Sequence, residues 1–433
     1  MLPLGTQCVN AAGHLEIGGC DAVELAQRFG TPLYVLDEAH LRANCQAYRE
    51  AFQHLHKDTF VYYATKALIC IALCQVMEEE GLGLDVASAG ELYTALKAGF
   101  PVERILLHGN NKTDEELRMA VEHRVGRIVV DHFDEIARIA HNARALNRTV
   151  PVMVRVTPGI KARTHDYITT GQMDTKFGFS LEAGQAMRAV EEVLSHPRLH
   201  LTGVHCHIGS QLLGLRAFEK AVEVMVAFMA EVYRRTGYTL QELNLGGGLG
   251  IRYLAEDNPP SVAQYAQAVV GSLKAACRHH GLPLPRLLLE PGRSIVGEAG
   301  VTLYTIGVVK EIPGVRTYVA VDGGLSDNPR PALYGAEYTV LLANKANQPP
   351  NTIVTVAGKH CESDILFRDV ELASPRPGDI LAVQSTGAYN YAMASNYNRY
   401  PRPAMVLVRN GEAKVIVRRE TLDDLIAHDV PLR

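Results

Sequence analysis

Residues 59–66 read TFVYYATK, a run rich in β-branched and aromatic residues that ends on a lysine. A run of this kind predicts a buried strand, and the apolar spacing in the stretch that follows, 68–80, predicts an amphipathic helix. The same alternation of strand and helix patterns continues to about residue 295. It is typical of βα units that build a parallel sheet.

Eight strands are predicted in this region. They lie at 59–65, 83–87, 104–108, 126–131, 151–157, 201–207, 241–246 and 285–290. Eight parallel strands with intervening helices close a (β/α)₈ barrel of the TIM type, which takes about 250 residues. Because the chain has 433 residues, a second domain is expected beside the barrel.

The pattern changes after Ser294 to β-rich runs separated by Pro, Gly and Asn. These runs lie at 301–310, 316–322, 337–343, 352–358, 379–384, 403–409 and 413–418. With no room for crossover helices, they predict an antiparallel β domain. The fold class is therefore α/β plus β. We expect N-terminal strands over 1–38 that pack with the β domain, the barrel over 39–297, and an antiparallel β-sandwich or β-barrel over 298–433.

Composition excludes several kinds of partner. The net charge is -4, from 43 basic and 47 acidic side chains that are interspersed along the chain. This balance gives no basic stripe for nucleic acid and no polybasic patch for a membrane. The sequence has no signal-peptide pattern and no apolar run of transmembrane length. Its cysteines are scattered and form no CxxC pair, which fits neither a disulfide framework nor a zinc knuckle. We predict a cytoplasmic protein that binds a small molecule and no metal.

Active sites of such barrels are assembled at the C-terminal ends of the strands. The side chains predicted at those ends are Lys66, Asp85, His108, His205, His207, the glycines at 246–248, Glu290 and Arg293. Lys66 is the only charged residue between Val61 and Gln75. It either extends along the surface to water or is desolvated, in which case its amine becomes a nucleophile suited to imine formation.

Two further elements predict an anion site and a cation site. The glycines at 246–248 follow a strand and let backbone N–H groups approach an anion, and Arg293 adds a cation nearby. Glu290 ends a strand of leucines, where a buried carboxylate needs a cationic partner. Arg293 and a protonated pyridine nitrogen are the two candidates.

His205 and His207 lie two residues apart on one strand and share a face. A metal pair, a partner that stacks on a ring, and two core histidines remain open on this pattern.

Motifs along the whole chain resemble those of the fold-type III pyridoxal-phosphate decarboxylases. They are YYATKA at 62–67, GLGLDVASAGEL at 81–92, HCHIGSQ at 205–211, LNLGGGLGI at 243–251, LEPGRSIV at 289–296, GKHCESD at 358–364 and GAYNYAMASNYN at 387–398. Within this family the chain is most similar to the enzymes that act on diaminopimelate. The resemblance implies a barrel of the alanine racemase type and pyridoxal 5'-phosphate as the cofactor.

The resemblance implies roles for residues of the barrel. Lys66 would carry the cofactor as a Schiff base, with the family aspartate, Asp85, close to it. Glu290 would bind the ring nitrogen, and His207 would stack on the ring. The phosphate would be held by Ser210, Gly247, Gly248, the Gly292 backbone, Arg293 and Tyr389.

It also implies a proton donor and an assembly. Cys361 would be the general acid that protonates the α-carbon after carbon dioxide leaves. In this family the cysteine serves the barrel of the partner subunit, so a homodimer with shared active sites follows.

The implied reaction is decarboxylation of meso-2,6-diaminopimelate at its D-centre to L-lysine, the last step of lysine biosynthesis. The distal carboxylate would be held by Arg293, Arg330, Tyr334 and Tyr389, and the distal amino group by Glu362. A substrate that is zwitterionic at both ends needs cations for one group and an anion for the other. The CESD run lacks a small residue that the family usually has before its aspartate, which bears on the placement of Glu362.

Other functions stay open on the sequence. A sister decarboxylase would act on ornithine, arginine, carboxynorspermidine or a carrier-bound glutamyl group. A related racemase would place an arginine where Glu290 stands. A metal-dependent barrel hydrolase would use His205 and His207, and a homologue that binds the cofactor without turnover is the last alternative. The long polar segment 162–180 is a candidate lid.

Overall fold

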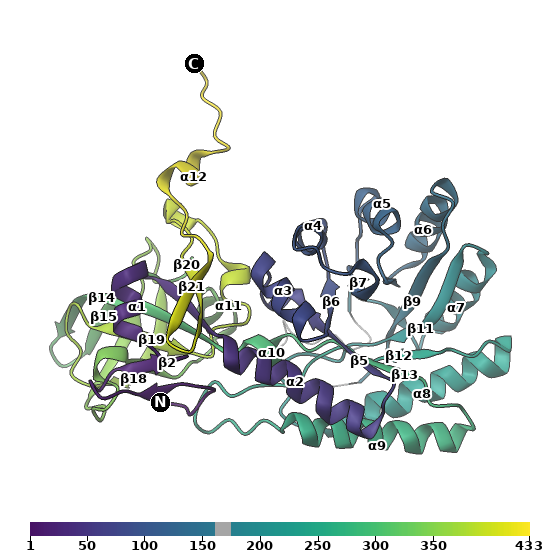
Figure 1. Cartoon of the computed structure of the whole chain (residues 1–433), viewed down its shortest axis with the longest axis horizontal. Coiled ribbons are helices and arrows are strands. Elements are labelled where there is room, and N and C mark those ends of the chain that lie inside the picture. Colours follow the sequence, from purple (N-terminus) through teal and green to yellow (C-terminus); the bar gives the residue numbers. More distant parts are fainter. Residues whose placement is uncertain (161–174) are drawn as a thin grey trace. The chain divides into compact units, whose positions relative to one another are not determined.

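The computed structural model describes residues 1–160 and 175–433. Its contacts divide the chain into two compact units (Figure 1). The barrel unit is formed by Asn44–Gly250 and Asn258–Ser294. The β unit is formed by Met1–Ala43, Ile251–Asp257 and Ile295–Arg433. The proposed lid, 162–180, lies outside the described residues from 162 to 174.

The barrel unit contains all eight predicted strands, which are parallel and follow one another around a closed ring. They are β5 (Thr59–Ala64), β6 (Gly83–Val86), β7 (Ile105–Leu107), β8 (Arg127–Val130), β9 (Val150–Thr157), β11 (Leu199–His205), β12 (Glu242–Asn244) and β13 (Arg286–Leu289). The ring closes where β8 pairs with β9 and where β13 pairs with β5. A short strand, β10 (Phe179–Ser180), adds to β9. The prediction of a TIM-type barrel is confirmed.

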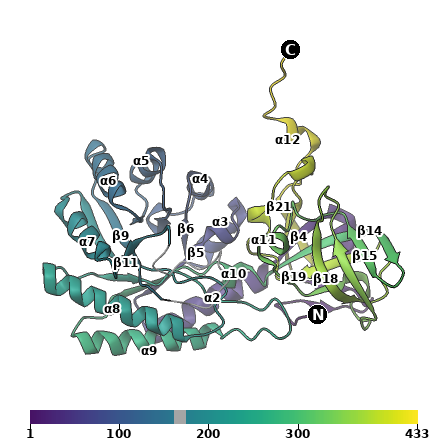
Figure 2. The same ribbon diagram turned by 180° about the vertical axis from the view of Figure 1, so that it is seen from behind.

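Helices lie outside the ring of strands in both views (Figures 1 and 2). They are α2 (Glu38–Leu55), α3 (Ile71–Glu79), α4 (Ala89–Lys97), α5 (Asp114–His123), α6 (Phe133–Ala145), α7 (Gln185–Ser195), α8 (Arg216–Thr236) and α9 (Val262–His280). A short helix, α10 (Arg293–Val296), follows β13 in the sequence. Capping boxes at Thr113 and Ser261 fix where α5 and α9 begin. Short 3₁₀ turns, η1 (Thr65–Ala67) and η2 (Val102–Arg104), complete the unit.

Large side chains fill the inside of the barrel. Tyr62, Leu106, Val129, Met153 and Leu288 come from five strands and form one buried cluster. The barrel is therefore packed through its middle, so a ligand has room only at a rim. In parallel βα units the rim that carries the chemistry is the one at the C-terminal strand ends.

The β unit is built on a mixed sheet (Figure 2). Its strands are β4 (Leu33–Asp37), β14 (Gly300–Ile312), β15 (Arg316–Val321), β16 (Val340–Leu342), β17 (Thr352–Ala357), β18 (Ile365–Leu372), β19 (Ile380–Gln384), β20 (Ala404–Arg409) and β21 (Glu412–Val417). Short helical pieces join them: α11 (Arg330–Tyr334), η4 (Ala343–Lys345), η5 (Tyr391–Met393), η6 (Tyr397–Arg399) and, after β21, α12 (Leu422–Ile426).

The expectation of an antiparallel sheet in the β unit is right for most pairs of neighbouring strands and wrong for two of them. Strand β15 pairs in parallel with β17, and β20 pairs in parallel with β4. The first pair has a long connection that contains α11 and β16, and the second joins opposite ends of the chain. Both connections are long enough to bring two strands side by side in parallel. Strand β18 was missed, although it pairs with β17 along most of its length.

The N-terminal segment belongs to the β unit in two ways. Strand β4 pairs with β14 and β20 inside the large sheet. The segment before it forms a separate small sheet of β1 (Cys8–Val9), β2 (Leu15–Ile17) and β3 (Cys20–Asp21), followed by α1 (Ala22–Phe29). Leu15 and Ile17 pack into the same core as Val301 and Val406, so this sheet covers the large one.

Among the described residues, helices that combine the length and the apolar character needed to cross a bilayer are absent.

Candidate functional site

The C-terminal strand ends of the barrel bring together side chains that are far apart in the sequence. Asp85 lies on β6, His108 directly follows β7, His205 ends β11, Asn244 ends β12 and Glu290 directly follows β13. All five are buried, with at most 6% of the residue exposed. Buried polar groups on a barrel rim need one another as partners, since water does not supply them.

Glu290 is the centre of this group. Its Oε1 accepts hydrogen bonds from His108 Nε2 at 2.8 Å and from Asn244 Nδ2 at 2.7 Å. Its Oε2 accepts one from His205 Nε2 at 3.1 Å. The sequence predicted a partner for this carboxylate, and it has three hydrogen-bond donors. Arg293, one of the two candidate partners, directs its guanidinium to Ser210 Oγ instead, at 2.9 Å.

The surroundings set the charges of these groups. Burial acts to raise the pKa of Glu290, but the imidazoles of His108 and His205 outweigh it and hold this pKa well below its ordinary value. Burial lowers the pKa of His205 to about 4. Burial and the charge of Glu290 raise the pKa of Asp85, while His108 and Lys66 oppose that shift. At neutral pH the site holds an ionised Glu290 beside a neutral His205.

Lys66 lies in η1, directly after β5. Electrostatic contacts with Asp85 and His207 place its amine among the rim residues. Of the two sequence interpretations, extension to water and desolvation, the structure favours the first, because Lys66 is exposed. Desolvation within this chain therefore does not activate the amine. Two features of Lys66 still suit imine chemistry, namely its neighbours Asp85 and His207 and its position at the rim.

The side chains of His205 and His207 have different neighbours in the structure, so they do not form a two-histidine metal pair. Strand β11 ends at His205, which binds Glu290, while His207 lies beyond the strand end beside Gly246. Burial and the nearby Lys66 lower the pKa of His207 well below its ordinary value, so this ring is neutral. A neutral, half-buried imidazole is suited to stacking on a flat ring.

The glycine run forms a tight loop against the end of β13. A Cβ atom on Gly247 would lie 2.2 Å from the carbonyl oxygen of Glu290, and Gly246 has a φ of 65°. Both positions therefore require glycine. Near the loop, Ser210 accepts the hydrogen bond from Arg293, and a Cβ on Gly292 would meet Ala64 at 3.1 Å. A hydroxyl, a guanidinium and a glycine loop form a donor set that fits a phosphate group.

Within the β unit, predicted substrate residues gather around Arg330. Its guanidinium lies 5.8 Å from the ring centres of Tyr334 and Tyr389 and 5.5 Å from that of Tyr253. Arg330 is 8% exposed, and its Nε has no hydrogen-bond partner among the described residues. Tyr389 has a φ of 63°, a conformation that is uncommon outside glycine and tends to occur at functional sites. A buried cation among aromatic rings is suited to binding a carboxylate.

Cys361 and Glu362 lie in the loop between β17 and β18, and both are exposed. The amide of Cys361 donates to Asn398 Oδ1 at 2.9 Å, and the hydroxyl of Tyr397 donates to Glu362 at 2.7 Å. Glu362 and Tyr397 also line a cavity of about 880 Å³, together with residues of α11 and β18. This volume falls in the range of small-molecule sites.

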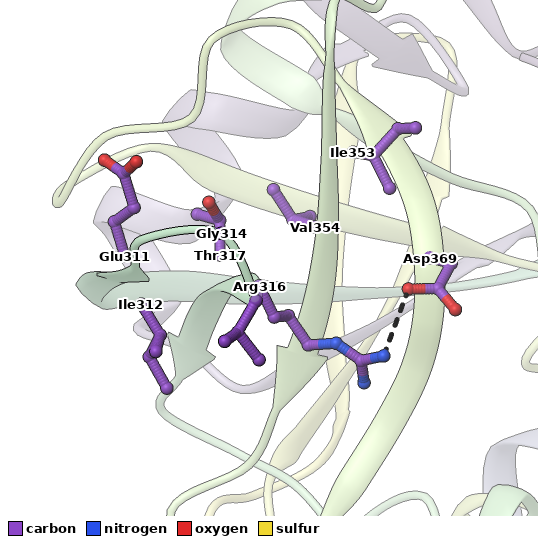
Figure 3. Close-up of a pocket in the computed structure, with 9 residues that line it drawn as sticks. Glu311, Ile312, Gly314, Arg316, Thr317, Ile353, Val354 and Asp369 are labelled. Atoms are coloured by element: carbon purple, nitrogen blue, oxygen red, sulfur yellow. Dashed lines mark ion pairs between the residues drawn. The ribbon is translucent and has the colours of Figure 1, made fainter.

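A second hollow in the β unit, of about 280 Å³, lies where β14 turns into β15 (Figure 3). Arg316 and Asp369 form an ion pair of 3.6 Å at its edge. The pair is open to solvent, and such contacts contribute little to stability. The apolar lining comes from Val315, Ile353 and their neighbours.

Sequence reasoning missed several residues of the site. Asn244 is a polar residue inside the apolar run LNL, and a buried amide there needed a partner. Arg155 on β9 is buried and lies 3.6 Å from Asp131, and its charge acts on Glu290 and Asp85. No sequence pattern indicated a role for Tyr253, because its contact with Arg330 depends on the tertiary fold. His108 was identified at its strand end but received no role.

Comparison with known proteins identifies the family of this chain. Residues 38–297 match the family described as "Pyridoxal-dependent decarboxylase, pyridoxal binding domain". A diaminopimelate decarboxylase of Bacillus subtilis is 50% identical over 99% of this chain and 98% of its own. A diaminopimelate decarboxylase of Halalkalibacterium halodurans is 49% identical, also over 99% of this chain and 98% of its own.

A solved structure is similar over the whole length. It is the diaminopimelate decarboxylase of M. jannaschii in co-complex with L-lysine, with a TM-score of 0.93 and 37% identity. The match covers 100% of this chain and 99% of that one.

The low pKa of His205 predicts a pH-dependent contribution to stability. An unfolded chain takes up a proton on this imidazole near pH 6.5, whereas the folded chain resists protonation down to about pH 4. As the pH falls through this window, the free energy of unfolding should fall by up to about 3 kcal/mol from this group. Urea unfolding of the wild type and of His205→Gln, between about pH 7 and about pH 4.5, measures it. Equal pH dependence in both proteins would contradict the assignment.

Proposed function

Because the chain belongs to the diaminopimelate decarboxylase family of pyridoxal-dependent decarboxylases, we propose that it removes the D-centre carboxylate of meso-2,6-diaminopimelate. The substrate loses one molecule of carbon dioxide and gains one proton, which gives L-lysine. The observation that carries the proposal is the buried, ionised carboxylate of Glu290 on the same barrel rim as Lys66 and the glycine loop.

The residues of the rim fit pyridoxal 5'-phosphate. A carboxylate held in its ionised form suits the ring nitrogen, because it stabilises the protonated ring. The glycine loop with Ser210 and Arg293 suits the phosphate, because backbone N–H groups, a hydroxyl and a guanidinium can all donate hydrogen bonds to it. Lys66 would hold the cofactor, His207 would lie against its ring, and Asp85 would stay close to the lysine.

When bound, the cofactor supplies an electron-accepting ring that takes up the electron pair left by the departing carbon dioxide. The protein then has to deliver a proton to the α-carbon. We assign this step to the thiol of Cys361, which is exposed on its loop and forms no disulfide bond.

The distal end of the substrate carries a second amino group and a second carboxylate. Arg330, Tyr334 and Tyr389 form the cluster that we assign to the carboxylate, since the Nε of Arg330 has no hydrogen-bond partner among the described residues. Glu362, which accepts a hydrogen bond from Tyr397, would bind the distal ammonium. The two groups give opposite charges for the two ends of a zwitterion.

We also propose that the protein is a cytoplasmic homodimer in which Cys361 and Glu362 serve the barrel of the second subunit. The exposure of both residues on a loop of the β unit supports this assembly.

A metal-dependent hydrolase is the strongest alternative of another class, because the ligand atoms of His108, His205 and Glu290 lie within 4.8 Å of one another. In the structure, however, both imidazoles direct Nε2 to the carboxylate as hydrogen-bond donors, at 2.8 and 3.1 Å. These contacts already satisfy the atoms that a metal would need. A racemase is disfavoured because Glu290, and not an arginine, stands at this position.

The reaction is tested by incubating the protein with pyridoxal 5'-phosphate and meso-diaminopimelate and measuring L-lysine and carbon dioxide. We expect the two products in equal amounts, with ornithine, arginine and carboxynorspermidine as parallel substrates that react poorly. Lys66→Ala should abolish the visible band of the bound cofactor and lower turnover by at least about a thousandfold. Lys97→Ala, an exposed lysine on α4, is the control. Full activity in Lys66→Ala would refute the assignment.

Cys361→Ala should bind the cofactor normally, because the visible band reports on the barrel. Product formation should slow by about a hundredfold, since a positioned proton donor is lost. Cys8→Ala removes the other exposed cysteine and serves as the control. If Cys361→Ala forms lysine at the wild-type rate, the proton comes from another group.

A further inference from the structure

Three side-chain donors from three different strand ends converge on the Glu290 carboxylate. His108 follows β7, His205 ends β11 and Asn244 ends β12. Their contacts with the carboxylate measure 2.8, 3.1 and 2.7 Å. All four side chains are buried, so the geometry is set by the barrel wall.

The contacts are unequally shared between the two carboxylate oxygens. Oε1 accepts from both His108 and Asn244, whereas Oε2 accepts from His205. Each carboxylate oxygen has two acceptor positions. Oε1 is therefore filled by the two side chains, and Oε2 keeps a position for one further donor.

The imidazole of His205 donates as a neutral ring. Its Nδ1 is buried and has no hydrogen-bond partner among the described residues. A protonated ring would place an N–H group there without an acceptor, which is costly in a buried site. The Nε2–H tautomer avoids this cost and directs the only ring proton to Glu290.

The backbone fixes each donor in place. His205 is in register with Arg155 on one side and Asn244 on the other. The backbone amide of His108 donates to the carbonyl of Val86 at 2.7 Å. The amide oxygen of Asn244 accepts from the backbone of Gly246 at 2.9 Å, which leaves its NH₂ group for the carboxylate. Asn244 thereby couples the carboxylate to the glycine loop.

We propose that His108 and His205 are positioning residues that keep Glu290 ionised and leave Oε2 as its acceptor for the ring nitrogen of the cofactor. This inference rests on the proposed function, because it assigns the open position on Oε2 to that nitrogen. Without either imidazole, the carboxylate would lose a hydrogen bond that stabilises its charge, and its pKa would rise toward that of a buried acid.

Other charged or titratable groups act on the same carboxylate and remain unchanged in the variants below. They are Asp85, Arg155, Cys206, His207 and Tyr62. Asp85 lies 3.7 Å from His108 Nε2, beyond hydrogen-bond distance, so Glu290 is the acceptor of that donor.

The test compares His108→Gln with His108→Asn, and His205→Gln with His205→Asn. A Gln amide reaches the position of Nε2 and can still donate, whereas an Asn amide reaches only as far as Nδ1. With meso-diaminopimelate and saturating cofactor, we expect the Asn variants to lose roughly tenfold to a hundredfold in kcat/KM and the Gln variants to retain most of it. His200→Asn, at an exposed position of β11, is the control.

The pH profile separates this role from a merely structural one. Loss of the donor raises the pKa of Glu290, so the acid limb of kcat/KM should move to higher pH in the Asn variants and stay in place in the Gln variants. The visible band of the bound cofactor should titrate in the same direction. Asn variants that bind the cofactor with an unmoved acid limb, or Gln and Asn variants that behave alike, overturn the inference. A wild type that binds the cofactor but does not form lysine would instead overturn the proposed function.

Discussion

The site depends on one constraint, which is that a carboxylate buried at the end of a leucine strand has to stay charged. Burial alone would raise the pKa of Glu290, and the protein opposes this with hydrogen bonds from His108, His205 and Asn244. None of these partners is a permanent cation. Hydrogen bonds from these donors stabilise the charge, and the carboxylate can still attract a protonated ring.

The barrel makes this arrangement achievable because it brings strand ends together that are distant in sequence. The contact between His108 and Glu290 spans 182 residues, and that between His205 and Glu290 spans 85. The same rim holds the glycine loop, whose backbone packs against the carbonyl of Glu290. The proposed phosphate site and the proposed ring site therefore share one rigid framework, and a change in one is expected to disturb the other.

The sequence predicted more of the fold than of the site. The eight barrel strands and the need of Glu290 for a partner followed from apolar runs and from the cost of burying charge. The identity of that partner did not, because Arg293, three residues away, was nearer in sequence than His108. The exposure of Lys66 and the parallel pairing of β4 with β20 also depend on tertiary contacts that no local pattern records. The family resemblance supplied the proposed roles, whereas the geometry added Asn244, Arg155 and Tyr253 and gave His108 a partner.

The most direct test of this account is the protonation state of the ring nitrogen in the bound cofactor, measured by the ¹⁵N chemical shift of labelled pyridoxal 5'-phosphate. In the wild type at neutral pH we expect a protonated nitrogen. In Glu290→Gln, which keeps the shape of the side chain and removes its charge, we expect an unprotonated nitrogen. An unprotonated nitrogen in the wild type, or the same shift in both proteins, would contradict this account.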